Sequence, residues 1–312
     1  MAKPQERLCI GLQDGRHFAS NDSRSFGVGQ TGDARQIHTI RGNVNKKDNG
    51  HNNDKKKKNF SVYLSRILLV VGLVLIAVAG VMLFKTQSEY HAQDVINEEL
   101  AHYATVPDNG NNIDKGPTVD WAGLRAVNNQ VVGWIQIPNS QVNYPVYQTT
   151  DNDYYLHTNA KGEWSIGGQI FMDYENNAEG LIDQQTILYG HHMRNGSMFQ
   201  YVGAMNDKQV FDKTTTIWYV TPSQTYELEP LLMYHTDEDD DEVRQFNFSS
   251  PEEFRSYLRG KLAKAVNARS DANDIISRTN HILTLFTCNY TDQYGRAVLL
   301  CVPKNEAQPT TK

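Results

Sequence analysis

The chain has 312 residues, enough for one large or two small domains with a sizeable core. Its formal net charge of −6 is spread unevenly, because residues 1–66 hold 13 lysines and arginines against 6 acidic residues, and the rest hold 17 against 30. This balance excludes a uniformly basic chain, so we expect no nucleic-acid partner. The change of sign near residue 66 indicates a boundary.

The N-terminal segment is polar. Residues 1–59 are rich in Asn, Asp, Gly, Lys, Arg and Gln and show no sustained apolar period, which predicts a disordered tail. The lysine run at 55–58 is of the kind that contacts anionic lipid headgroups. We therefore interpret residues 1–66 as a basic tail on one side of a membrane.

The next segment is apolar. Residues 67–84, "ILLVVGLVLIAVAGVMLF", are 18 uncharged residues between Arg66 and Lys85. As a helix they would span about 27 Å, close to the thickness of a bilayer core. The run begins too deep in the chain for a signal peptide, and it lacks the polar face of a core helix. We predict a single transmembrane helix, with the basic residues 1–66 in the cytoplasm and residues 85–312 outside.

Helical signals continue beyond the membrane segment. Residues 88–104 predict a helix capped by Ser88, and residues 107–117 read as a linker, so 85–118 is expected to be an extracellular helix and linker. Residues 119–130 predict a further helix, with Asp120 as its cap and three apolar side chains on one face, those of Trp121, Leu124 and Val127.

The period then changes to that of β-strands. Short runs rich in β-branched and aromatic residues, bounded by turn signals, predict eight strands and a mainly β domain, either a closed barrel or a sandwich. The runs are 131–138, 142–148, 168–174, 185–190, 215–221, 226–236, 281–288 and 296–302.

One helix is predicted between the sixth and seventh strands. Residues 249–266 place Ser250 at the N-cap, Pro251 in the first turn and Glu253 where it completes a capping box. The acidic run before it, "DEDDDE" at 237–242, could hold a cation, but it lacks the ligand spacing of an EF-hand loop. We favour a solvated loop.

Three cysteines are present, and Cys9 falls in the tail, which leaves Cys288 and Cys301 outside. If 282–288 and 296–302 form a hairpin, Cys288 lies opposite Arg296 and Cys301 pairs near Leu283. The two sulfurs would then be about 15 Å apart, whereas bridged Cα atoms lie within about 7 Å. The hairpin therefore predicts two free thiols.

A cysteine nucleophile needs a thiolate, a proton donor for the leaving group and a cation for the developing oxyanion. "LYGHHM" at 188–193 places His191 and His192 just past a strand end, and Arg296 opens the strand after Cys288. Taken singly, each residue has an ordinary explanation, such as an inert buried thiol. A zinc site is disfavoured, because no Cys-x-x-Cys or His-x-x-x-His pair exists.

Together these motifs resemble those of a known family. "TLFTCNYTDQYGR" (284–296) resembles the sortase signature TLxTC followed by an arginine on the next strand, and "LYGHHMRNGSMF" (188–199) resembles the histidine motif of class B sortases. "VVGWIQIPNSQVNYPV", "DNDYYL" and "GGQIFMDYENN" resemble earlier strands of the family. The likeness covers about 119–302, and the helix between strands six and seven favours class B.

The resemblance implies an eight-stranded sortase-like barrel over 119–304, with N-terminal helices and a polar tail at 305–312. It implies a cysteine transpeptidase of the Gram-positive surface, without metal or cofactor. Cys288 would attack the carbonyl after threonine in a C-terminal sorting motif, Arg296 would stabilise the oxyanion, and His191 would exchange protons. A peptidoglycan precursor or a pilin lysine would supply the accepting amine. By position, the substrate groove would be lined by Asn152, Leu156, Leu285 and Phe286.

The chain departs from the family pattern at a few positions. His192 stands where asparagine is usual, Phe286 fills the variable position of TLxTC with a bulky ring, and Asp292 lies in a loop where some members carry an acid. Two other functions stay open. The chain could be a membrane-anchored binding module that keeps the fold without activity, or a thiol peptidase that transfers its acyl group to water.

Overall fold

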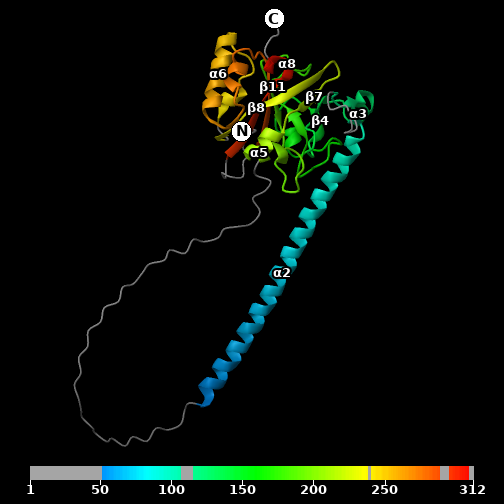
Figure 1. Cartoon of the computed structure of the whole chain (residues 1–312). Helices are drawn as coiled ribbons and strands as arrows, with labels where there is room; N and C mark the ends of the chain where they lie inside the picture. Colours follow the sequence, from blue (N-terminus) through cyan, green and yellow to red (C-terminus); the bar gives the residue numbers. More distant parts are fainter. Residues whose placement is uncertain (1–50, 107–114, 238–239, 289–294, 309–312) are drawn as a thin grey trace, which may run out of the picture. The chain divides into compact units, whose positions relative to one another are not determined.

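The structure is a computed structural model that describes residues 51–106, 115–237, 240–288 and 295–308. The chain forms two units, and we describe each by itself: a helical segment up to Thr86, and a globular unit from Gln87 onward. Figure 1 colours both along the chain. The tail predicted for residues 1–50, Cys9 included, lies outside the described residues.

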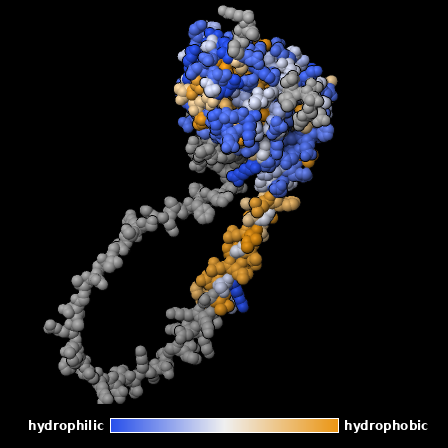
Figure 2. Space-filling view, viewed as in Figure 1, coloured by the Kyte–Doolittle hydropathy of each residue, from blue (hydrophilic) through white to orange (hydrophobic). Residues whose placement is uncertain are grey.

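The helical segment belongs to one long helix, α2 (His51–Ala101). The segment Val62–Ala101 contains a stretch long and apolar enough to cross a membrane, and its apolar side chains form the orange surface in Figure 2. This is consistent with the predicted membrane anchor. The structure differs from the sequence prediction in two places: residues 51–59 are helical, and Ser88 lies inside the helix instead of capping a second one. No Gly or Pro separates Lys85 from Ser88, so a helix already nucleated in the apolar run simply continues.

The last turns of α2 belong to the globular unit. Leu100 is buried there, and the Gln93 amide donates a hydrogen bond to the Gly168 carbonyl at 3.3 Å. A two-residue strand, β1 (Ala104–Thr105), then pairs with β2 (Thr118–Val119). Most of the predicted linker lies outside the described residues.

The next helix, α3 (Trp121–Val127), starts where the sequence predicts. The Asp120 carboxylate accepts a hydrogen bond from Gly123 N at 3.0 Å, which satisfies one of the unpaired N–H groups of the first turn. Leu124 is fully buried, and Trp121 and Val127 pack against the same core.

All eight predicted strands are present, and they close into a barrel. Along the sheet, neighbours follow the order β11-β10-β6-β5-β4-β3-β7-β8, and β8 pairs again with β11 to complete the ring. The strands are β3 (Val131–Gln136), β4 (Asn143–Tyr147), β5 (Ile170–Met172), β6 (Gln185–Tyr189), β7 (Ile217–Val220), β8 (Thr225–Asp237), β10 (Ile282–Cys288) and β11 (Gly295–Pro303).

A ninth strand was not predicted. β9 (Ala265–Ala268) pairs with β8 outside the ring, so the predicted helix 249–266 is two elements: α6 (Pro251–Ala263) and the start of β9. The short helices are η2 (Tyr154–Leu156), α4 (Gln200–Ala204), α5 (Lys208–Lys213), η3 (Asp241–Arg244), α7 (Ala272–Ile276) and α8 (Lys304–Ala307). Because α8 holds residues 304–307, the polar tail begins later than predicted.

Helix α6 lies between β8 and β10 in the chain, as predicted (Figure 1). The Ser250 hydroxyl accepts from Glu253 N at 3.1 Å, whereas the Glu253 carboxylate accepts from Ser249 N at 2.8 Å, one residue before the expected donor. Asp240, from the acidic run, lies 3.8 Å from the buried ammonium of Lys261 on α6. The described part of that run therefore neutralises a lysine and caps η3.

Each face of the strands contributes to a different hydrophobic cluster. Phe286 packs in the cluster that includes α6 and α7, whereas its neighbour Leu285 packs in the one that includes α4 and α5. Both faces of β10 and β11 are thus buried, and every residue of β11 is buried. The two strands that carry Cys288 and Arg296 form the rigid centre of the barrel.

Candidate active site

The β10–β11 hairpin has the predicted register. Cys288, the last residue of β10, pairs with Arg296, and Leu283 pairs with Cys301. Cys301 is a free, fully buried cysteine, as predicted. The distance between the paired positions 283/301 and 288/296 is five residues along the strands, so the two cysteines belong to opposite ends of the hairpin.

Arg296 is a buried cation at the Cys288 end. Its side chain is fully buried, because β11 is flanked by β10 on one side and β8 on the other, where Thr236 is its partner. One guanidinium nitrogen, Nη1, donates to the Gly295 carbonyl at 3.4 Å. A guanidinium stays protonated at any physiological pH, so it provides a permanent positive charge beside the position of Cys288. Such a charge favours a thiolate and can stabilise an oxyanion.

The strand that leads to His191 runs parallel to the strand that ends at Cys288. Tyr189 of β6 pairs with Phe286 of β10, and Gly190 N donates to the Phe286 carbonyl at 3.1 Å. Two residues further along each strand, His191 and Cys288 come level at the same edge of the sheet. The parallel pairing thereby brings together two residues that lie 97 positions apart in the chain.

Gly190 is required by the close packing before His191. A Cβ atom at this position would lie 2.5 Å from Ile170 Cδ1 and 2.7 Å from the Phe199 ring. After Gly190, the backbone is held by Phe199 N, which donates to the His191 carbonyl at 2.8 Å. A larger residue at 190 would push His191 away from the sheet edge.

The His191 imidazole is held by the segment around η2. Its Nε2 lies 2.8 Å from the Leu156 carbonyl, and because a carbonyl only accepts, Nε2 carries a proton. The side chain is 3% exposed, and the ring of His157 lies 5.5 Å away, centroid to centroid. The His192 ring lies in a different environment, against Gly203 of α4, where an added Cβ atom would be 2.6 Å from it. Of the two histidines, His191 is the one fixed beside the Cys288 strand.

The four residues predicted to line the groove are all buried, and Leu285 packs in the hydrophobic cluster on the face of β10 opposite to that of Phe286. Asn152 is 3% exposed and precedes η2, Leu156 ends η2 and contacts His191 through its carbonyl, and Leu285 and Phe286 precede Cys288 on β10. Asp292 lies outside the described residues. In the part of the chain that the structure describes, no cluster of three or more His, Cys, Asp or Glu side chains could hold a metal.

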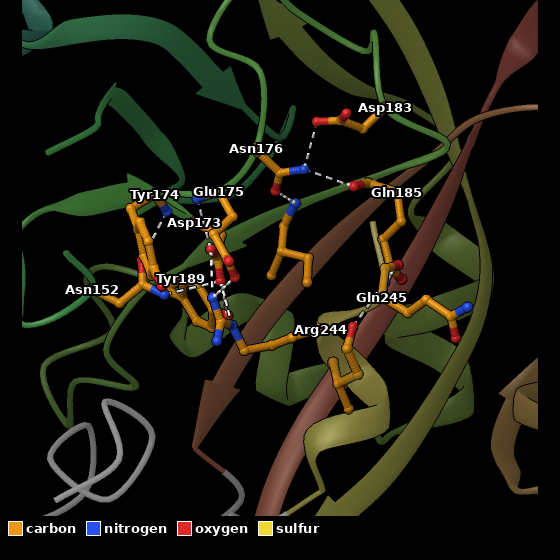
Figure 3. A network of polar contacts seen from close by, with 12 residues as sticks. Asn152, Asp173, Tyr174, Glu175, Asn176, Asp183, Gln185, Tyr189, Arg244 and Gln245 are labelled. Carbon is orange, nitrogen blue, oxygen red and sulfur yellow. Dashed lines mark hydrogen bonds and ion pairs between the residues drawn. The ribbon is translucent and has the colours of Figure 1, made fainter. Parts of the chain in front are cut away.

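Sequence reasoning missed a buried ion pair next to the site. Asp173 directly follows the apolar strand β5 and is fully buried against Arg244 from η3 (Figure 3). A charged residue right after three buried apolar ones was a usable signal for Asp173. Arg244 had none, because its partner is 71 positions away.

Comparisons with known proteins identify the family of this chain. Residues 135–304 match the sortase domain. The sortase B of Listeria monocytogenes is 32% identical over 243 residues, which cover 75% of this chain and 94% of the relative. The chain belongs to the sortase family, class B. It is accordingly a cysteine transpeptidase of that family.

Further sortases B resemble the chain in sequence and in structure. The Staphylococcus aureus sortase B is 30% identical over 179 residues, 57% of this chain and 71% of the relative. The structure of Bacillus anthracis sortase B in complex with AAEK1 has a TM-score of 0.58 at 30% identity, covering 69% of this chain and 98% of that one. A Staphylococcus aureus sortase B–substrate complex has a TM-score of 0.52 at 28% identity, covering 58% of this chain and 82% of that one.

Proposed function

We propose that the chain is a membrane-anchored sortase that cleaves a C-terminal sorting motif of surface proteins after threonine and transfers the acyl group to a cell-wall or pilin amine. The observation that carries this proposal is the pairing of strands: β11 sets Arg296 opposite Cys288, and β6 brings His191 level with it. The proposed nucleophile and cation thus come from β10 and β11, and the proposed proton carrier follows the end of the neighbouring strand β6 by two residues.

The first half of the reaction forms a thioester. The Cys288 thiolate attacks the carbonyl carbon after threonine, and the negative charge that develops on the oxygen is stabilised by the Arg296 guanidinium. His191 first takes the proton of the Cys288 thiol, and when the C–N bond breaks the leaving amine takes that proton from His191. Because Nε2 of His191 donates to the Leu156 carbonyl, we assign this proton transfer to Nδ1.

The second half transfers the acyl group. An incoming amine attacks the thioester carbonyl and loses a proton to His191, the C–S bond breaks, and the Cys288 thiolate is regenerated. Water in place of the amine would make the enzyme a peptidase. Burial of His191 and Arg296, at 3% and 0% exposure, supports transfer, because a site with little exposed polar surface limits the access of water.

The substrate groove would determine which sorting motif the enzyme accepts. Asn152, Leu156, Leu285 and Phe286 are nearly fully buried, so we propose that they shape the groove wall from beneath. Among these four residues, Phe286 should influence the choice of sorting motif most. Its ring occupies the variable position of TLxTC and packs edge-on against Tyr189, with centroids 5.4 Å apart.

We also propose the orientation of the anchor. The basic run 55–58 and Arg66 precede the apolar segment, and acidic residues follow it, so the rule that positive loops stay inside places the N-terminus in the cytoplasm and the barrel outside. Protease treatment of intact protoplasts checks this orientation. Digestion of the barrel supports it, and a barrel protected until the membrane is permeabilised contradicts it.

The activity is tested with the detergent-solubilised full-length chain. It is incubated with a library of fluorogenic peptides that carry sorting motifs, with and without amine nucleophiles, beside the Cys288→Ala variant. We expect cleavage by the wild type only, and products joined to the amine when one is present. Equal turnover by Cys288→Ala would refute the cysteine mechanism, and hydrolysis that no amine suppresses would make the enzyme a peptidase.

A further inference from the structure

The Asp173 carboxylate is the most heavily hydrogen-bonded acid near the site. Its side chain is fully buried, yet both of its oxygens are occupied. Oδ2 accepts from Asn152 Nδ2 at 2.9 Å, from the Tyr189 hydroxyl at 2.8 Å and from Arg244 Nε at 2.8 Å. Oδ1 accepts from Arg244 Nη2 at 2.9 Å and from Glu175 N at 3.1 Å. Figure 3 shows these side chains converging on one carboxylate from separate segments.

Arg244 balances this buried charge. Its guanidinium holds Asp173 through two nitrogens and reaches Glu175 Oε2 at 2.6 Å, and its side chain is 24% exposed. The hydrogen bonds that Arg244 donates to Asp173 are the main cause that raises the pKa of Arg244 above its ordinary value. A buried ion pair of this kind contributes little net stability compared with apolar residues, but removing one partner is costly. We therefore expect this ion pair to act by fixing the positions of the side chains around it.

Two of the Asp173 partners control the position of His191 by different routes. Tyr189 ends β6 and precedes His191 by two residues, so fixing its hydroxyl fixes the exit of the strand. Asn152 precedes η2, whose last residue, Leu156, accepts the hydrogen bond from His191 Nε2. Asn152 is fixed at both ends of its amide, because its oxygen also accepts from Tyr174 N at 3.0 Å. One carboxylate is thus bonded both to the segment that leads into His191 and to the segment that leads into the carbonyl orienting it.

Tyr189 also reaches the strand of the nucleophile. Its ring stacks on Phe171 with centroids 5.2 Å apart and meets Phe286 edge-on at 5.4 Å. Phe286 precedes Cys288 by two residues and lies on the same face of β10. A shift of the Tyr189 ring would therefore change the packing of both β6 and β10.

We propose that Asp173 is a positioning residue of the transpeptidase, with Arg244 as its counter-ion. It acts through Tyr189 and Asn152, which set the orientation of His191 relative to Cys288. Asp173 touches neither substrate nor the reacting atoms. This inference rests on the proposed role of His191 as the proton carrier.

The test removes one hydrogen bond and keeps the ring. Tyr189→Phe deletes the hydroxyl that donates to Asp173 while it preserves the contacts with Phe171 and Phe286. The control is Tyr219→Phe, since Tyr219 is a buried tyrosine on β7 whose hydroxyl has no hydrogen-bond partner in the described part of the chain, so its removal deletes a hydroxyl and no hydrogen bond. Asp173→Asn is measured as well, but it leaves Arg244 without its counter-charge and can fail to fold, so Tyr189→Phe decides.

We expect Tyr189→Phe to lower kcat about 10-fold, as the misplacement of a proton-transfer group does, and to leave KM nearly unchanged. Tyr219→Phe should keep both constants. A merely structural role predicts a different result, in which Tyr189→Phe loses thermal stability and the kcat per folded molecule of both variants stays at the wild-type value. That result, in an enzyme whose turnover depends on Cys288, would overturn this inference and leave the proposed function intact.

A second readout does not depend on turnover. In full-length protein with ¹⁵N-labelled histidine, the His191 signals report which ring nitrogen carries the proton. We expect the Nε2-protonated tautomer in the wild type and in Tyr219→Phe, and a mixture of tautomers in Tyr189→Phe and in folded Asp173→Asn. Identical His191 signals in all variants would contradict the positioning role, even if the proposed function itself failed.

Discussion

The two ends of the β10–β11 hairpin carry the same residue type in opposite environments. At one end Cys301 pairs with Leu283, is fully buried in the apolar core, and burial raises the pKa of its thiol well above the ordinary value. At the other end Cys288 pairs with Arg296, a permanent cation. We infer that the register of the hairpin, and not the cysteine itself, decides which thiol reacts.

The two thiols have neighbours with opposite effects on the thiolate. An apolar neighbour disfavours the thiolate through desolvation, whereas a cation favours it. Five residues of strand separate the two environments. We therefore expect the two ends to respond very differently to the same chemical change.

The largest effect is expected from replacing each of the two cysteines by alanine. Cys288→Ala should lower kcat by at least about 10³-fold, because no group replaces the nucleophile. Cys301→Ala should keep the kcat per folded molecule. Single-turnover cleavage of a sorting-motif peptide measures both, and loss of activity in both variants would contradict the division of roles.

A smaller but still large effect is expected from Arg296→Lys. A lysine keeps the charge but loses the planar fork of donors, so we expect kcat to fall roughly 10²-fold, in the range of a lost oxyanion donor. Arg278→Lys is the matched control, because Arg278 donates to backbone carbonyls away from the site, those of Asp274 and Glu306, both at 2.9 Å. Equal kinetics for both variants would remove Arg296 from the mechanism.

Alkylation separates the thiols without any substrate. In a Cys9→Ser background at pH 7.5, iodoacetamide should label Cys301 at least about 10²-fold more slowly than Cys288, since a thiol in the core reacts only when the structure opens. Mass spectrometry after brief labelling measures the two rates. Comparable rates would mean that the Arg296 end offers the thiolate no advantage.

The smallest effect concerns stability at alkaline pH. The unfolded Cys301 thiol has a pKa near 9.0 and the folded one is higher, so the folded chain gains from the protonated thiol below pH 9 and loses this gain as pH rises. At pH 10 the wild type should have lost about 1.4 kcal/mol relative to Cys301→Ala. Urea unfolding with a reductant at pH 7 and pH 10 measures the difference, and a constant difference would contradict the burial effect.

Much of the barrel could be predicted because its signals are local. The eight strands are short β-branched and aromatic runs between turns, and the hairpin register follows from the seven residues that separate Cys288 from Arg296. The N-terminal cap of α6 could also be predicted from the sequence, because Ser250 and Pro251 act within the first turn of the helix. The catalytic candidates followed from motifs within single segments.

What escaped prediction depends on contacts between distant segments. β9 was taken as the end of a helix, because Ala265 and Val266 continue the helical pattern and only pairing with β8 makes them a strand. Asp173 and Arg244 form their pair across 71 residues, and no periodicity records such a contact. Ser88 was misread as a cap because helix continuation from the apolar segment outweighs a local cap signal.

The central claim is that the thiol opposite Arg296 carries the acyl group. Its most direct test is to incubate the full-length wild type with an intact sorting-motif peptide that the enzyme cleaves but no amine, quench with acid, and map the peptides by mass spectrometry. The account predicts an acyl thioester on Cys288 and unmodified Cys301. An acyl group on Cys301, or continued turnover with no acylated cysteine, would contradict it.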